Sequence, residues 1–173
     1  KSMKPQFVVL AAGKVGGIIE NSKYPAEFMV SNMGIQLNVI QSAARHGVER
    51  LMMYGSSCMY PREYDGPMGE NLLMSDYPEP TSIAYAMAKL AGIHMCLAYN
   101  RQLGKSKFIP VIPNSVYGPN DNFESGTGHV LAGLMDRFHK ASISSAEEVV
   151  IWGTGTPRRE FIHADDVADA SVY

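Results

Sequence analysis

Short apolar runs alternate with longer amphipathic stretches along the first two thirds of the chain. Residues 7–12 form a continuous apolar run closed by Gly13, and residues 51–54 and 108–112 form two more. Runs of this length are typical of strands in a parallel sheet that is buried on both faces. Pro110 lies inside the third run and predicts a local irregularity there.

Apolar residues recur at helical spacing from residue 25 to residue 46, and Gly47 is expected to end this helix. They form two stripes about a third of a turn apart. The first stripe contains Met29, Met33, Leu37, Ile40 and Ala44, and the second contains Phe28, Ile35, Val39 and Ala43. Two apolar faces predict two packing partners, of which one is the sheet and the other a second subunit.

The later part of the chain continues the alternation of strands and helices. The pattern predicts helices over residues 82–103 and 130–141, a strand over residues 149–152, and a loop over residues 113–119. Asp165 and Asp166 are expected to cap a last helix that follows them. This rhythm predicts an α/β fold with a doubly wound, Rossmann-like parallel sheet, whose ligands bind at the carboxyl ends of the strands.

Composition narrows the class of protein. The chain has 173 residues, 46% of them hydrophobic, and a formal net charge of −2, so it can bury a core but offers no basic field to nucleic acid. No run approaches the ~20 apolar residues of a membrane span. Two cysteines indicate neither a disulfide scaffold nor a zinc site, and no other metal site is predicted. We therefore expect a cytoplasmic enzyme or binding protein without a membrane or nucleic-acid partner.

The most informative pair is Tyr85 and Lys89, because a spacing of four residues places a phenol and an ammonium side by side on a helix. A neighbouring positive charge favours the phenolate, so Lys89 is expected to lower the pKa of Tyr85 and make it a proton donor to a carbonyl. Some chains of this composition would contain such a pair by chance. Whether the pair is functional therefore depends on the residues around it.

Polar residues follow the strand at residues 51–54, where this fold places functional groups. Ser56 comes directly after Gly55, and its hydroxyl would hydrogen-bond the same carbonyl oxygen that Tyr85 protonates. Taken alone, Ser56 and Ser57 are more simply explained as turn residues, and Cys58 as a small buried hydrophobe.

Together with Tyr85 and Lys89, this arrangement resembles the Ser–Tyr–Lys constellation of the extended short-chain dehydrogenase/reductase superfamily. Residues 10–17, 55–61 and 152–161 are similar to segments of the GDP-L-fucose synthase family within it. That resemblance implies a 3,5-epimerisation of GDP-4-keto-6-deoxymannose followed by reduction of the 4-ketone with NADPH. It also implies a homodimer with packed helices.

The resemblance implies roles for individual residues. Lys89 would hold the nicotinamide ribose, Ser56 would orient the ketone, and Cys58 and His129 would be the base and the acid of epimerisation. The residues expected to bind NADP are Leu10, Ala11, Ala12, Gly55, Ser56, Ser57, Tyr85, Lys89, Pro113, Asn114, Ser115, Val116 and His129. Arg137, Arg159 and Trp152 would bind the GDP-sugar, although Arg137 alone would be taken as a solvated side chain and Trp152 equally well as core.

The resemblance also predicts a division into two parts. Residues 1–118 would be the C-terminal part of a dinucleotide-binding domain, and residues 119–173 the beginning of a substrate-binding region with a return segment. Residues 13–17 lack the glycine spacing of a phosphate-binding turn, so we expect a fragment of a longer protein and infer NADPH, not NADH, from the resemblance alone.

Two alternatives stay open. One is a related nucleotide-sugar epimerase, reductase or dehydratase that acts on another sugar, such as a GDP-heptose. The absence of an acidic pair beside Ser57 and Cys58 argues against a dehydratase. The other is a non-catalytic dinucleotide-sensing module, which would be expected to have lost the Tyr–Lys pair.

Overall fold

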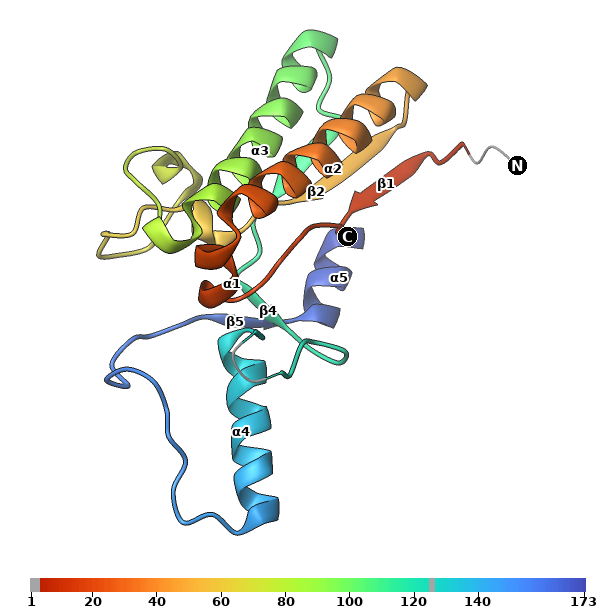
Figure 1. Ribbon diagram of the computed structural model, residues 1–173. Coiled ribbons are helices and arrows are strands. Elements are labelled where there is room, and N and C mark those ends of the chain that lie inside the picture. The colour runs from red at the N-terminus through yellow and green to blue at the C-terminus, as the bar shows by residue number, and fades with distance from the viewer. Residues whose placement is uncertain (1–3, 125–126) are drawn as a thin grey trace. The chain divides into compact units, whose positions relative to one another are not determined.

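The computed structural model describes residues 4–124 and 127–173, which form two compact units (Figure 1). Unit 1 comprises Lys1–Val15 and Tyr24–Pro113, and unit 2 comprises Gly16–Lys23 and Asn114–Tyr173. The expected division into a dinucleotide-binding part, residues 1–118, and a substrate-binding part, residues 119–173, stays a prediction.

Unit 1 is built on a parallel three-stranded sheet. Strands β1 (Phe7–Leu10), β2 (Arg50–Tyr54) and β3 (Phe108–Val111) lie in the order β1-β2-β3. Helix α2 (Pro25–His46) connects the first two strands, and helix α3 (Ile83–Leu103) connects the last two (Figure 1). This confirms the predicted parallel, Rossmann-like α/β class.

The two crossover helices lie side by side against the sheet (Figure 1). Because the strand order advances in one direction, right-handed crossovers bring both helices to the same face. Phe7 and Val9 are 62% and 58% exposed, whereas Leu10 is buried. The expectation that the first strand is buried on both faces is therefore wrong for the described residues.

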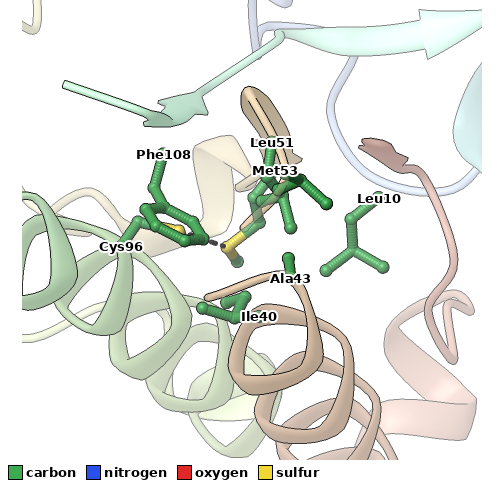
Figure 2. Close-up of a cluster of buried hydrophobic side chains, with 8 residues drawn as sticks. Leu10, Ile40, Ala43, Leu51, Met53, Cys96 and Phe108 are labelled. Atoms are coloured by element: carbon green, nitrogen blue, oxygen red, sulfur yellow. Dashed lines mark hydrogen bonds between the residues drawn. The ribbon is translucent and has the colours of Figure 1, made fainter. Parts of the chain in front are cut away.

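The main core of unit 1 lies between the sheet and its two helices (Figure 2). Ile40 of α2, Cys96 of α3 and Leu51 of β2 are fully buried in it, and Phe108 of β3 closes one side. Burial of one such aliphatic side chain contributes roughly 1.5–3 kcal/mol to folding. These contacts hold the ends of the strands and the start of α3 in one framework.

Helix α2 has the predicted bounds, and Gly47 ends it in the left-handed conformation with φ 68°. Phe28, Ile40 and Ala43 of the predicted stripes are buried, whereas Met33 and Leu37 are 44% and 49% exposed, so the second partner expected for the helix stays a prediction. Two polar residues, Asn32 and Gln36, are also buried. Gln36 Nε2 donates to the carbonyl oxygen of Asn32, at 2.8 Å, and to that of Ala88 in α3, at 3.2 Å.

Helix α3 begins one residue later than expected, after a short 3-10 turn at Pro80–Ser82. Gly104 ends it with φ 61°. The segment Pro80–Leu103 has the length and composition of a membrane span, with a mean hydropathy of 1.2, contrary to the sequence-based expectation. This is weak evidence, because the core helix of a globular unit has the same properties and α3 packs on α2 and β3.

Unit 2 contains a two-stranded parallel sheet. It is formed by β4 (Ser115–Tyr117) and β5 (Phe161–His163), and helix α4 (Val130–Ser144) lies between them in the chain. Helix α5 (Ala164–Val172) follows β5 directly. The short helix α1 (Ile18–Lys23) also belongs to this unit, and the N–H of Gly17, the residue before it, donates to the Thr127 carbonyl at 3.2 Å.

Three sequence-based expectations fail in unit 2. Residues 149–152 form no strand, and Val150 is 75% exposed, because no described segment pairs with it. The expected loop at residues 113–119 contains β4. The N-cap of α5 is His163, whose Nδ1 accepts the Asp165 N–H at 3.2 Å, so Asp165 and Asp166 lie within the first turn instead.

Candidate functional site

Tyr85 and Lys89 lie in the first two turns of α3, next to the carboxyl end of β2. The Lys89 Nζ is 5.8 Å from the centroid of the Tyr85 ring and donates a hydrogen bond to the backbone carbonyl of Tyr54, at 3.0 Å. The lysine is only 6% exposed. The helical spacing therefore brings the pair together as predicted, and the last residue of β2 anchors the ammonium.

Burial lowers the pKa of Lys89 from its ordinary value, since the charged form loses hydration. An ammonium has three N–H donors, and within residues 4–124 and 127–173 the bond to Tyr54 is its one hydrogen bond. The other donors are free to bind hydroxyl groups, as the ribose of a dinucleotide requires. Gly13, three residues after β1, leaves room for the Asn32 side chain, because a Cβ on it would lie 2.9 Å from the Asn32 Oδ1.

The pKa of Tyr85 is raised to about 12, contrary to the expected lowering by Lys89. Burial is the largest cause, and negative charge on Cys58 adds to it. The hydrogen bond with the Ser56 side chain acts in the opposite direction. Tyr85 is thus protonated throughout the neutral range, which is the state a proton donor needs.

Ser56 and Cys58 belong to a tight turn between β2 and the rest of the crossover. Ser56 is the N-cap of the 3-10 turn Ser57–Met59, and its Oγ accepts the Cys58 backbone N–H at 3.4 Å. Met59 is fully buried against Leu90 of α3. The turn that carries the serine and the cysteine is therefore attached to the helix that carries Tyr85 and Lys89.

Two residues beside this group were not predicted. The buried ring of Phe28 in α2 meets the Tyr85 ring edge to face, with centroids 6.3 Å apart. Asn32, one turn further on, holds the segment after β1: its Oδ1 accepts the Lys14 N–H at 3.1 Å, and its Nδ2 donates to the Lys14 carbonyl at 2.9 Å. The position of Asn32 among the apolar residues of this helix could have indicated that its side chain is buried and hydrogen-bonded.

The expected cofactor residues of unit 1 lie at the strand ends. Leu10 and Gly55 are buried, Ser57 and Pro113 are half-buried, and Ala11 and Ala12 are exposed. A Cβ at Gly55 would lie 2.8 Å from the Met59 Cε, so a larger residue there would displace the buried Met59 side chain.

In unit 2, Arg137 of α4 stacks on Trp152. The guanidinium carbon is 4.7 Å from the centroid of the indole ring, and Nη1 donates to the Val150 carbonyl at 3.2 Å. Trp152 is 68% exposed, which excludes the alternative that it is core. The pair forms an open aromatic and cationic surface of the kind that accepts a planar ring and a phosphate.

The remaining predicted residues of unit 2 are less tightly held. Asn114 Nδ2 donates to the Glu160 carboxylate, and the neighbouring Arg159 is exposed, with Nη1 donating to the Arg158 carbonyl at 2.9 Å. His129 is exposed and precedes α4 as its N-cap, without a side-chain cap. Ser115 and Val116 are the first residues of β4.

The structure thus gathers the predicted residues into two groups. Unit 1 brings together Ser56, Cys58, Tyr85 and Lys89. Unit 2 holds Arg137 on Trp152 and contains His129 and Arg159 separately. In the part of the chain that the structure describes, no group of three or more His, Cys, Asp or Glu side chains could hold a metal ion.

A parallel α/β framework with a serine after one strand and a Tyr–Lys pair on the following helix is that of a dinucleotide-dependent enzyme of the short-chain dehydrogenase/reductase type. The chain belongs to the NAD dependent epimerase/dehydratase family, whose model matches residues 1–173.

Within this family the chain is similar to GDP-L-fucose synthases. It is 53% identical over 170 residues to GDP-L-fucose synthase 1 of Arabidopsis thaliana, covering 98% of this chain and 52% of that protein. The chain therefore spans about half the length of that relative. This similarity confirms the resemblance to the GDP-L-fucose synthase family that was inferred from residues 10–17, 55–61 and 152–161.

Solved structures share the fold. A GDP-L-fucose synthetase from Naegleria fowleri bound to NADP matches with a TM-score of 0.87 and 32% identity, covering 98% of this chain and 55% of that one. A GDP-6-OMe-4-keto-L-xylo-heptose reductase from C. jejuni matches with a TM-score of 0.90 and 34% identity, covering 98% and 57%.

Proposed function

We propose that the full-length protein is a GDP-L-fucose synthase. It would epimerise GDP-4-keto-6-deoxy-D-mannose at carbons 3 and 5 and then reduce the 4-ketone with NADPH to GDP-L-fucose. The observation that carries this proposal is the group of Ser56, Cys58, Tyr85 and Lys89, in a chain that is 53% identical to a GDP-L-fucose synthase.

Reduction depends on the two residues at the start of α3. When bound, NADPH supplies the hydride that the ketone carbon accepts. Tyr85 is protonated and gives its proton to the ketone oxygen, while Ser56 hydrogen-bonds the same oxygen. Lys89, anchored on the Tyr54 carbonyl, directs its remaining N–H donors to the nicotinamide ribose.

Epimerisation needs a base and an acid, because the protons beside a ketone are acidic and are removed from one face and returned to the other. Cys58 would be the base and His129 the acid. In support, the Cys58 thiol is half-buried next to Tyr85 and Ser56, where a ketone held by those two residues would come close to it. Support for His129 is its exposed position at the start of α4 and the resemblance to the synthases.

The substrate's diphosphate would be bound by Arg137 and Arg159, because a guanidinium pairs with phosphate oxygens through two N–H groups. Trp152 would cover a flat part of the nucleotide. The stacking of Arg137 on Trp152 supports this proposal, since it presents charge and ring on one open surface.

The proposal is tested by separating the two half-reactions in the full-length protein. With GDP-4-keto-6-deoxymannose in D₂O, the wild type should incorporate deuterium at carbons 3 and 5 and consume NADPH. Tyr85→Phe should exchange deuterium without consuming NADPH, and Cys58→Ser should lose exchange while it still binds NADPH. Full NADPH consumption by Tyr85→Phe would contradict the catalytic role of the tyrosine.

A related GDP-heptose reductase is the second candidate, favoured by the TM-score of 0.90 to a GDP-heptose enzyme. Steady-state rates with both GDP-sugars distinguish the two. A kcat/KM at least tenfold higher for the heptose would replace the fucose assignment. A non-catalytic sensing module is disfavoured, because the Tyr85 and Lys89 pair is intact.

We also propose that the enzyme is a cytoplasmic homodimer without a membrane or nucleic-acid partner. A groove of about 140 Å³ runs between α2 and α3, and its lining includes Met33, Leu37 and Met95. A second copy that packs its own α2 and α3 here would bury the exposed Met33 and Leu37 side chains. Sedimentation as a monomer at micromolar concentration would contradict the dimer.

A further inference from the structure

The aromatic ring of Phe28, in the first turn of α2, is held by several contacts. Its side chain is only 1% exposed. The Lys14 Nζ lies 5.3 Å from the ring centroid, and a salt bridge of 2.7 Å to Glu27 holds that ammonium in place. The backbone of Phe28 is bonded as well, since the buried Asn32 Nδ2 donates to its carbonyl oxygen at 2.8 Å. The ring therefore has a fixed position within unit 1.

The phenol ring of Tyr85 packs against this fixed ring. The two ring centroids are 6.3 Å apart and the ring planes lie at 83°, which is an edge-to-face contact. The Lys89 Nζ lies 5.8 Å from the centroid of the same phenol ring. Edge-to-face pairs of aromatic rings have a preferred angle and separation. The orientation of the phenol is thus set by a residue of α2 as well as by its own helix, α3.

The orientation of this phenol matters for proton transfer. A proton donor has to lie within hydrogen-bond reach of the atom that it protonates. A tyrosine ring turns about two side-chain bonds, so a change in either torsion moves the hydroxyl group at the far end of the ring. A displacement of about 1 Å can lower the rate of a reaction by about 10²-fold.

We propose that Phe28 is a positioning residue for Tyr85: its ring holds the phenol in the orientation from which the hydroxyl protonates the ketone. This inference rests on the proposed function and adds a residue of α2 to the reduction step. Phe28 acts through Tyr85 and has no role in epimerisation. Burial is the largest cause that raises the pKa of Tyr85, and a buried ring beside the phenol contributes to that burial.

The test compares Phe28→Leu with the wild-type full-length enzyme, because leucine keeps an apolar side chain and removes the ring. With GDP-4-keto-6-deoxymannose in D₂O, deuterium incorporation at carbons 3 and 5 measures epimerisation, and single-turnover NADPH consumption measures reduction. We expect reduction to slow by roughly 10- to 100-fold, the effect of a misplaced donor. Deuterium exchange and the affinity for NADPH, measured by fluorescence, should stay within about threefold of the wild type, because uniform binding is retained.

Phe108→Leu is the matched control. Phe108 is also 1% exposed, but its ring contacts that of Tyr99, with centroids 5.4 Å apart. The control makes the same chemical change in the core of unit 1, so thermal unfolding should show a loss of stability in both variants. Reduction by Phe108→Leu should stay within about threefold of the wild type, since the contact with Tyr85 is kept.

Phe28→Tyr is the conservative variant, because it keeps the aromatic ring. It should reduce the ketone within about threefold of the wild-type rate. If it loses reduction as fully as Phe28→Leu, the ring contact is not the cause and the positioning role is wrong.

The remaining outcomes separate this inference from the proposed function. If Phe28→Leu reduces the ketone at the wild-type rate, Phe28 does not position Tyr85 and the proposed function stands. The same holds if exchange and NADPH affinity fall as much as reduction, or if Phe108→Leu slows reduction equally, because the effect is then one of general packing. A wild-type enzyme that neither exchanges deuterium nor consumes NADPH would instead refute the proposed function.

Discussion

The ammonium of Lys89 is held by the backbone carbonyl of Tyr54, 3.0 Å away, although the lysine is only 6% exposed. A buried charge with a single hydrogen bond is unfavourable unless a ligand supplies further partners. The bond therefore ties the last residue of β2 to the second turn of α3 and leaves the ammonium ready for hydroxyl groups.

Lys89→Met tests this arrangement, because methionine keeps much of the stem and removes the ammonium. We expect weaker binding of NADPH by about tenfold and a reduction rate lower by roughly 10²–10⁴, the range typical of lost acid–base catalysis. The free energy of unfolding should change by no more than ~1–3 kcal/mol, since the loss of the bond to Tyr54 is offset by the removal of a desolvated charge. Fluorescence titration, single-turnover kinetics and urea unfolding measure the three quantities. Undiminished NADPH affinity would contradict the ribose contact.

The raised pKa of Tyr85 predicts a change of stability at alkaline pH. Folding raises the pKa from 10.0 to about 12, so the folded state retains the proton more strongly than the unfolded state. The stability that depends on protonation of Tyr85 is fully present below pH 10 and is lost as the pH rises through 12. The loss in the free energy of unfolding amounts to roughly 2–3 kcal/mol for a pKa shift of this size.

Tyr85→Phe is the control for this effect, since it lacks the ionising group and keeps the ring against Phe28. The difference in unfolding free energy between wild type and variant should be constant from pH 8 to 9.5. Above pH 10 the wild type should lose stability relative to the variant. Denaturant unfolding at each pH measures this difference in unfolding free energy. If the difference stayed constant up to pH 11.5, the pKa of Tyr85 would not be raised by folding.

The sequence predicted the helices and strands that show periodic apolar patterns. It did not predict features that depend on an individual tertiary contact. The bounds of α2, the position of α3 and the three strands of unit 1 follow from apolar patterns and from Gly47 and Gly104. The burial of Asn32 and Gln36 does not, because hydrophobic periodicity assigns polar side chains to the surface. Only the tertiary structure shows that the Asn32 amide bonds the backbone of Phe28 and Lys14, and that the Gln36 amide bonds the Ala88 carbonyl of α3.

For the site, the helical spacing predicted that Tyr85 and Lys89 meet, and the turn after β2 predicted the place of Ser56. The pKa of Tyr85 was predicted in the wrong direction. A spacing of four residues shows that the ammonium is near the phenol, but not that the phenol loses enough hydration in the fold for its pKa to rise. The catalytic roles themselves stay predictions.

Gly92→Ala should destabilise unit 1 strongly. A Cβ at this position of α3 would lie 1.8 Å from the Gln36 Oε1 and 2.4 Å from the Met53 Cε, so these two buried side chains would have to shift. We expect a loss of about 1–3 kcal/mol, the usual cost of overpacking. Gly133→Ala in α4 is the matched control, because nothing lies within 4 Å of its Cβ position. It should be neutral or stabilising by up to ~1 kcal/mol, as alanine favours helices. Thermal unfolding of both variants measures the contrast, and equal melting temperatures would contradict the close helix contact.

Arg137→Lys is expected to weaken binding of the GDP-sugar, even though it keeps the charge. The guanidinium stacks on Trp152 at 4.7 Å and bonds the Val150 carbonyl, and an ammonium can replace neither the planar stacking nor the paired donors. KM should rise about tenfold while the rate of NADPH oxidation at saturating substrate stays within about threefold, because uniform binding is lost and the reacting groups are untouched. Arg101→Lys, in the last turn of α3, is a control that keeps the same chemical change outside the proposed substrate surface. Two results would show that Arg137 and Trp152 do not bind the nucleotide. One is an equal increase of KM in Arg101→Lys, and the other is a fall of kcat in Arg137→Lys with unchanged KM.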